Sequence, residues 1–157
     1  MKDATKRDYG FIVPKLTDSP NINKIVRTAE DLYNANIYSQ VCIFNSYNGK
    51  VMRHSIPVLH LNQSKFFYGN LFLFDIQSVL MTNTYPNIFN RYFYATNIPW
   101  EKNNTSNYKE WLEVFGSENL QIIAQNQHIA DLFEICWKKP ILIAQDFTYD
   151  QIQSIVE

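Results

Sequence analysis

Apolar residues occur along this chain in two patterns, which predict two kinds of element. Short continuous runs, rich in β-branched and aromatic residues and closed by polar residues or proline, are typical of buried strands. Longer segments with apolar residues three or four positions apart predict amphipathic helices between the runs. The runs are YGFIVP (9–14), QVCIFN (40–45), PVLHL (57–61), NLFLFD (70–75), the start of RYFYATNIPW (91–100), LQIIA (120–124) and ILIA (141–144).

Helix-start signals support the helical segments. Ser19 is a candidate N-cap, with Pro20 at the first helical position of a segment that extends to residue 36. The segments 107–116 and 148–156 each begin with a capping box, formed by Asn107 with Glu110 and by Thr148 with Gln151. A short helix is also expected in the apolar-rich segment 76–84.

The stretch IIAQNQHIADLF (122–133) passes from a strand pattern into helical spacing through four polar residues. We expect Asn126 or Gln125 to cap a helix that begins near Gln127, because side chains with an oxygen acceptor satisfy the first free amides of a helix.

Strands that alternate with helices favour βαβ units, because parallel strands need crossover connections that helices supply. We therefore predict one Rossmann-like three-layer α/β domain over residues 1–157, with a mostly parallel sheet covered on both faces. No internal repeat or low-complexity linker indicates a second domain.

Composition narrows the class of protein. The chain is 46% hydrophobic and its formal net charge is −1, which gives no electrostatic reason to expect nucleic-acid binding. No apolar run reaches the roughly 18 residues of a membrane span, and the first ten residues lack the apolar stretch of a signal peptide. We expect a cytoplasmic protein without membrane contact. Cys42 and Cys136 both lie in apolar periodic segments, so we expect core positions for them.

Ligands of open α/β sheets bind at the carboxyl ends of the strands, so the polar residues after each apolar run are the candidate site. His128 is the one suited to proton transfer near neutral pH, which makes it the candidate catalytic residue. Trp100, which follows Pro99, is a candidate for stacking on a sugar or a base. The full set of candidate ligand-binding residues is Thr96, Asn97, Trp100, Gln125, Asn126 and His128.

The motifs of common cofactor sites are missing. The loop after the first apolar run is PKLTDSPN, without a glycine-rich dinucleotide or P-loop motif, and no three residues have metal-ligand spacing. We expect no cofactor and no metal, although backbone amides at the helix start near Asn21 could hold an anion.

The segment LQIIAQNQHIADLFEICWKKPILIAQDF (120–147) resembles the closing part of the N-terminal Rossmann-like domain of glycosyltransferases with the two-domain GT-B fold. NLFLFD and RYFYATNIPW resemble the middle strands of that domain. The resemblance implies a sugar or nucleotide-sugar ligand, and catalysis between two domains of which this chain matches one. The abundance of Asn, Ile, Tyr and Phe is typical of AT-rich genomes, such as that of a phage or a streamlined bacterium. Short orphan domains of this kind occur in phage genomes, so a phage-encoded orphan half-domain is one expectation, and its location would then be the host cytoplasm.

Two functional classes follow. We prefer a glycosyltransferase-like binding or accessory domain that acts with a protein partner, either another chain or a second copy, and is not catalytic alone. The alternative is a small stand-alone enzyme that acts on a sugar or nucleotide ligand with His128 as general base. The sequence leaves open whether the protein is an enzyme.

Overall fold

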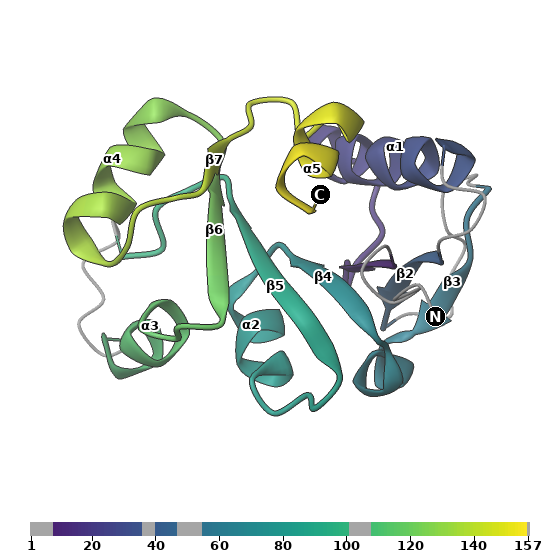
Figure 1. Ribbon diagram of the computed structural model, residues 1–157, viewed down its shortest axis with the longest axis horizontal. Coiled ribbons are helices and arrows are strands. Elements are labelled where there is room, and N and C mark those ends of the chain that lie inside the picture. The colour runs from purple at the N-terminus through teal and green to yellow at the C-terminus, as the bar shows by residue number, and fades with distance from the viewer. Residues whose placement is uncertain (1–7, 36–39, 47–54, 101–107, 157) are drawn as a thin grey trace.

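The computed structural model describes residues 8–35, 40–46, 55–100 and 108–156, which form one seven-stranded sheet (Figure 1). All its strand pairs are parallel, in the order β3-β2-β1-β4-β5-β6-β7. The predicted α/β class with a mostly parallel sheet is therefore confirmed. The strands are β1 (Tyr9–Ile12), β2 (Val41–Asn45), β3 (Val58–His60), β4 (Gly69–Leu73), β5 (Ile88–Ala95), β6 (Leu120–Ala124) and β7 (Leu142–Ile143).

Helices cover both faces of the sheet. α1 and α5 lie side by side on one face, and α2, α3, α4 and the 3-10 helix η2 lie on the other (Figure 1). The change of face follows from the strand order, because crossovers are right-handed and the chain adds strands on one side of β1 and then on the other. The helices are α1 (Pro20–Ala35), η2 (Leu61–Phe66), α2 (Ile76–Thr82), α3 (Tyr108–Phe115), α4 (Gln127–Cys136) and α5 (Tyr149–Val156).

The core is double, with one apolar cluster on each face of the sheet. In β4, Leu71 and Leu73 belong to the cluster under α2, α3 and α4, whereas Phe72 belongs to the cluster under α1 and α5. Successive side chains of a strand point to opposite faces, so a strand buried on both sides is apolar at most positions. This is why the strands were visible as continuous apolar runs.

Local start signals are confirmed where the structure describes them. The Ile22 backbone N–H donates to Ser19 Oγ at 3.3 Å, and the Thr148 N–H donates to Gln151 Oε1 at 2.9 Å. The capping box predicted at Asn107 lies outside the described residues. None of the helices in the described part of the chain combines the length and hydropathy of a membrane span.

One core prediction is wrong. Cys42 is buried, but Cys136, the last residue of α4, is exposed. The next residue, Trp137, packs its ring against Trp100 and Phe115 at centroid distances of 6.0 and 5.6 Å. The helix ends here, so Trp137 takes the inward position and Cys136 remains at the surface.

Candidate functional site

The carboxyl ends of the seven parallel strands form one edge of the sheet, and the strand order reverses there between β1 and β4. The loop after β1 is held by the end of β2 and has no glycine-rich turn. Asn45 Nδ2 donates to the backbone oxygens of Val13 and Pro14 at 3.0 and 3.2 Å, and Ser46 Oγ donates to Pro14 O at 2.6 Å. This edge is the candidate ligand site, because open α/β sheets bind ligands where the order reverses.

Two polar side chains of this edge are engaged as helix caps. Asp75 Oδ1 accepts from the Ser78 N–H and Oδ2 accepts from Ser78 Oγ, both at 2.8 Å, at the start of α2. Asn126 Oδ1 accepts from the Ile129 N–H at 2.9 Å at the start of α4. Of the two predicted caps of this helix, Asn126 is confirmed.

Four of the predicted ligand-binding residues are brought together by the pairing of β5 with β6. Ala95 lies opposite Ala124, and the Gln125 N–H donates to Ala95 O at 3.0 Å. The residues that follow these strands, Thr96 and Asn97 on one side and Gln125 and Asn126 on the other, are therefore neighbours. Asn97 and Asn126 are exposed, whereas Thr96 and Gln125 are half-buried. The cap uses Asn126 Oδ1 and leaves the side-chain amide nitrogen to donate.

Trp100 belongs to a cluster of aromatic rings. Its ring packs edge-on against Phe133, Phe115 and Trp137, at centroid distances of 4.9, 5.8 and 6.0 Å. The ring is half-buried, so it is more exposed than Trp111, which is 7% exposed. A stacking role remains a prediction, and it would have to use the part of the ring that these contacts leave open.

His128 is exposed in the first turn of α4. The polar contacts of this turn are made by its neighbours: Asn126 caps the helix, and Gln127 Nε2 donates to Asp131 Oδ1 at 2.6 Å. The His128 side chain is therefore at the surface, two residues after Asn126.

Two carboxylates of this edge are paired with residues of α1. Asp18 Oδ1 accepts from Asn23 Nδ2 at 3.0 Å, and Asp146 forms an ion pair with Lys24 at 3.6 Å. Within the described ranges, no three His, Cys, Asp or Glu side chains are grouped so that they could hold a metal ion. The residues directly after β5 and β6 thus offer neutral amides and one hydroxyl as ligand groups, whereas the loop after β1 carries the exposed Lys15.

Tyr94 joins this edge to the loop after β7. Its hydroxyl donates to Ala144 O at 2.8 Å and to Gln145 O at 3.3 Å. Burial raises the pKa of Tyr94 to about 12, with a further increase from the negative charge of Asp146 and an opposing hydrogen bond from Gln125. The phenol is therefore neutral over the physiological pH range and acts as a hydrogen-bond donor.

Two residues outside the predicted ligand-binding set shape this edge. Phe147, the described non-glycine residue with positive φ (49°), is fully buried, and its ring lies 4.6 Å from that of Tyr94. Asn45 is buried at the end of β2, where it holds the loop after β1. The available signal for Asn45 was a polar residue that closes an apolar run. Phe147 and Tyr94 gave no local signal, because they meet only in the fold.

No family model matches the sequence, and no curated protein and no solved structure is significantly similar to it. The functional argument therefore depends on the fold and on the groups at its carboxyl edge.

Proposed function

We propose that this chain is the binding half of a glycosyltransferase-like assembly. It holds a polar, sugar-bearing ligand at the carboxyl edge of the sheet and acts together with another protein chain or a second copy. On its own it is not catalytic. The proposed setting is the cytoplasm of a phage-infected cell, as suggested by the residue composition, and the sugar class comes from the resemblance of residues 120–147 to GT-B enzymes.

The observation that carries this proposal is the group formed by Thr96, Asn97, Gln125 and Asn126 after two adjacent strands. Hydroxyl and amide side chains can each donate and accept hydrogen bonds, as sugar hydroxyls do. The half-buried pair Thr96 and Gln125 is held by the sheet, whereas Asn97 is exposed and accessible to a ligand. This combination suits an uncharged polar ligand.

The described part of this edge lacks a group that is placed to act as a general acid or base, and this is the reason for proposing a second chain. Asp75 caps a helix and Asp146 is paired with Lys24, so neither carboxylate is unengaged. His128 is exposed, and electrostatic assistance by a side chain surrounded by water is weak. A partner that covers the edge would exclude water and could supply an acid or base.

Thermal-shift measurements with a panel of nucleotide sugars and free sugars test ligand binding. A true ligand at 100 times its dissociation constant should stabilise the protein by about 2.7 kcal/mol. Asn97→Ala should remove most of that stabilisation. Asn87→Ala is the matched control, because Asn87 is also exposed but lies in the turn before β5, at the opposite edge of the sheet.

The absence of a shift with every sugar, or an equal loss in both asparagine variants, would contradict ligand binding at this edge. Light scattering of the purified chain across a range of concentrations, alone and with a candidate partner, tests assembly. Sugar transfer or hydrolysis by a chain that remains monomeric would replace this proposal with the enzyme alternative, provided that His128→Ala abolishes the activity.

A further inference from the structure

In the part of the sheet formed by β2 and β3, one face is covered by a short 3-10 helix instead of an α-helix. The connection from β3 to β4 has eight residues: the six of η2, Leu61–Phe66, and then Phe67 and Tyr68. Phe67 lies over β1, where a Cβ added to Gly10 would be 3.0 Å from its ring, and its ring is 5.6 Å from that of Phe44 on β2. Such a short 3-10 segment cannot cover the width of β2 and β3 as an α-helix would.

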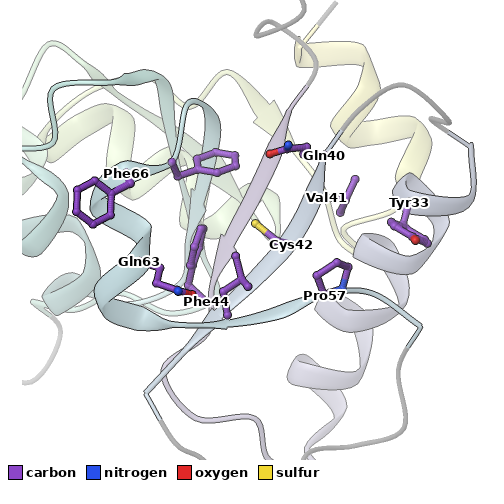
Figure 2. A pocket seen from close by; sticks show the side chains of 10 residues that line it. Tyr33, Gln40, Val41, Cys42, Phe44, Pro57, Gln63 and Phe66 are labelled. Atoms are coloured by element: carbon purple, nitrogen blue, oxygen red, sulfur yellow. The ribbon is translucent and has the colours of Figure 1, made fainter.

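A pocket of about 610 Å³ lies at this place, between η2 and the amino ends of β2 and β3 (Figure 2). Its inner side chains are apolar and well buried: Cys42 and Phe67 are each 7% exposed, and Phe44 is 1% exposed. Figure 2 shows Phe66 and Gln63 on one side of β2 and Pro57 and Tyr33 on the other. The volume falls within the range of sites for small molecules, roughly 300–1,000 Å³.

The mouth of the pocket exposes large apolar side chains to water. Phe66 is 73% exposed, Tyr33 41% and Leu59 39%, and all three line the pocket. Apolar area removed from water contributes favourably to binding, and a concentration of exposed apolar side chains beside a cavity is typical of a ligand site.

The polar groups of the pocket define the charge of a ligand. Among the described residues, those that line the pocket include the amides of Gln40 and Gln63 and no charged side chain. Asp8 lies next to the pocket, because its Oδ1 accepts from the Gln40 N–H at 2.9 Å. Burial, and then the charge of Asp8, raise the pKa of the Cys42 thiol to about 12, so the thiol is not a nucleophile here. Lys65 lies at the mouth, with its Nζ 4.9 Å from the centroid of the Phe66 ring. An anion bound at the Gln40 end would instead lie beside the Asp8 carboxylate, which is unfavourable.

We propose that this pocket binds an uncharged small molecule with an apolar ring or alkyl body and a group that hydrogen-bonds to a primary amide. Binding is non-covalent. The site lies at the amino ends of β2 and β3, whereas the sugar-binding group lies at the carboxyl ends of β5 and β6. The two sites are independent, and either could fail without the other.

Fluorescence titration with two related dyes tests the proposal. N-phenylnaphthylamine is uncharged, and anilinonaphthalene sulfonate adds an anionic group to the same ring system. We expect saturable binding of the uncharged dye, and binding of the sulfonate that is about tenfold weaker or undetectable. No saturable binding of the uncharged dye, or tighter binding of the sulfonate, would overturn the proposal.

Matched variants locate the bound dye. Leu59→Glu places a charge at the mouth and should weaken binding of the uncharged dye about tenfold or more. Ile143→Glu makes the same change on the opposite edge strand, β7, at a residue that is 41% exposed compared with 39% for Leu59, and should leave the affinity unchanged.

Phe66→Ala is a second variant that should fold normally, because the side chain is largely exposed. The loss of its ring contact should weaken dye binding about threefold to tenfold. Equal affinities of Leu59→Glu and Ile143→Glu, or an unchanged affinity of Phe66→Ala, would show that the dye binds elsewhere and would overturn the assignment.

Discussion

At the amino edge of the sheet a buried cation on β5 joins neighbouring segments, whereas at the carboxyl edge of the same strand a buried phenol does so. Arg91 is 6% exposed, and its Nη1 donates to Asn83 Oδ1 at 2.7 Å, to Val79 O at 3.1 Å and to Thr82 Oγ1 at 3.2 Å. Its Nη2 donates to Ser117 Oγ at 3.2 Å. Arg91 thus ties the end of α2 to the loop before β6.

Tyr94, three residues later on β5, makes fewer bonds at the other edge. Its hydroxyl donates to Ala144 O and Gln145 O, which lie in the loop between β7 and α5. Around it the ligand candidates Asn97 and Gln125 are neutral and partly accessible.

The difference shows how stability and function are separated in this fold. Arg91 meets the negative end of the α2 dipole and satisfies its donors with neutral oxygens, an arrangement that leaves few groups for a ligand. Burial lowers the pKa of Arg91 but an arginine remains charged, so the amino edge stays tied over the whole pH range of a folded protein. At the carboxyl edge the joining group is a neutral phenol, and the Asn97 side chain is exposed.

The largest expected effect comes from Arg91→Ala. The substitution removes a buried side chain and leaves the Thr82, Asn83 and Ser117 oxygens without this donor, so it should lower the free energy of unfolding by about 3 kcal/mol. Denaturant titration measures this loss. Arg27→Ala is the control, because Arg27 is exposed on α1 and should change stability by no more than about 0.5 kcal/mol. Similar losses in both variants would contradict a special role for the amino edge.

Alkaline pH should weaken the carboxyl edge selectively. The pKa of Tyr94 is about 12 in the folded protein and 10.0 without burial, so the unfolded chain loses this proton first. The contribution of Tyr94 is complete below pH 10 and is lost between pH 10 and 12, by roughly 1 kcal/mol per pH unit. Tyr94→Phe should cost about 1 kcal/mol at neutral pH through its lost hydrogen bond, and should fall less steeply above pH 10.

Comparison with Tyr94→Phe is needed because other groups titrate in the same range. Tyr92 also has its pKa raised to about 12, mainly by burial, and contributes in the same direction. Burial, and then the charge of Arg91, lower the pKa of Lys138, so its neutralisation acts in the opposite direction. Tyr92 and Lys138 are present both in the unsubstituted protein and in Tyr94→Phe, so their titration affects both stability curves alike. Parallel stability curves above pH 10 would therefore show that Tyr94 does not titrate as expected.

The smallest expected effect is at the start of α4. Asn126→Ala removes the acceptor of the Ile129 N–H and should cost about 1 kcal/mol of stability. Gln125→Ala should cost less, because Gln125 is not the cap. Chemical denaturation of both variants separates the two residues, and equal costs would contradict the assignment of the cap.

Some features of this protein were determined by the sequence alone, because they depend on residues close together in the chain. The Asn126 cap and the box of Thr148 with Gln151 each join residues three positions apart. The central strands of the sheet are buried on both faces, so their continuous apolar runs predicted a parallel α/β sheet. The sequence also placed Thr96, Asn97, Gln125 and Asn126 at the carboxyl ends of strands, but that they are neighbours was decided by the pairing of β5 with β6.

Only the tertiary structure decided the contacts between distant segments. Tyr94 and Ala144 are 50 positions apart, and Arg91 and Ser117 are 26 apart, so no local pattern reveals either bond. Periodicity placed Cys136 in the core, but the end of α4 and the packing of Trp137 put it at the surface. Phe66 is exposed beside the pocket because the six-residue 3-10 helix η2 covers only part of β2 and β3. Strand order and packing decide how much of these strands is covered, and the residues of η2 alone do not reveal it.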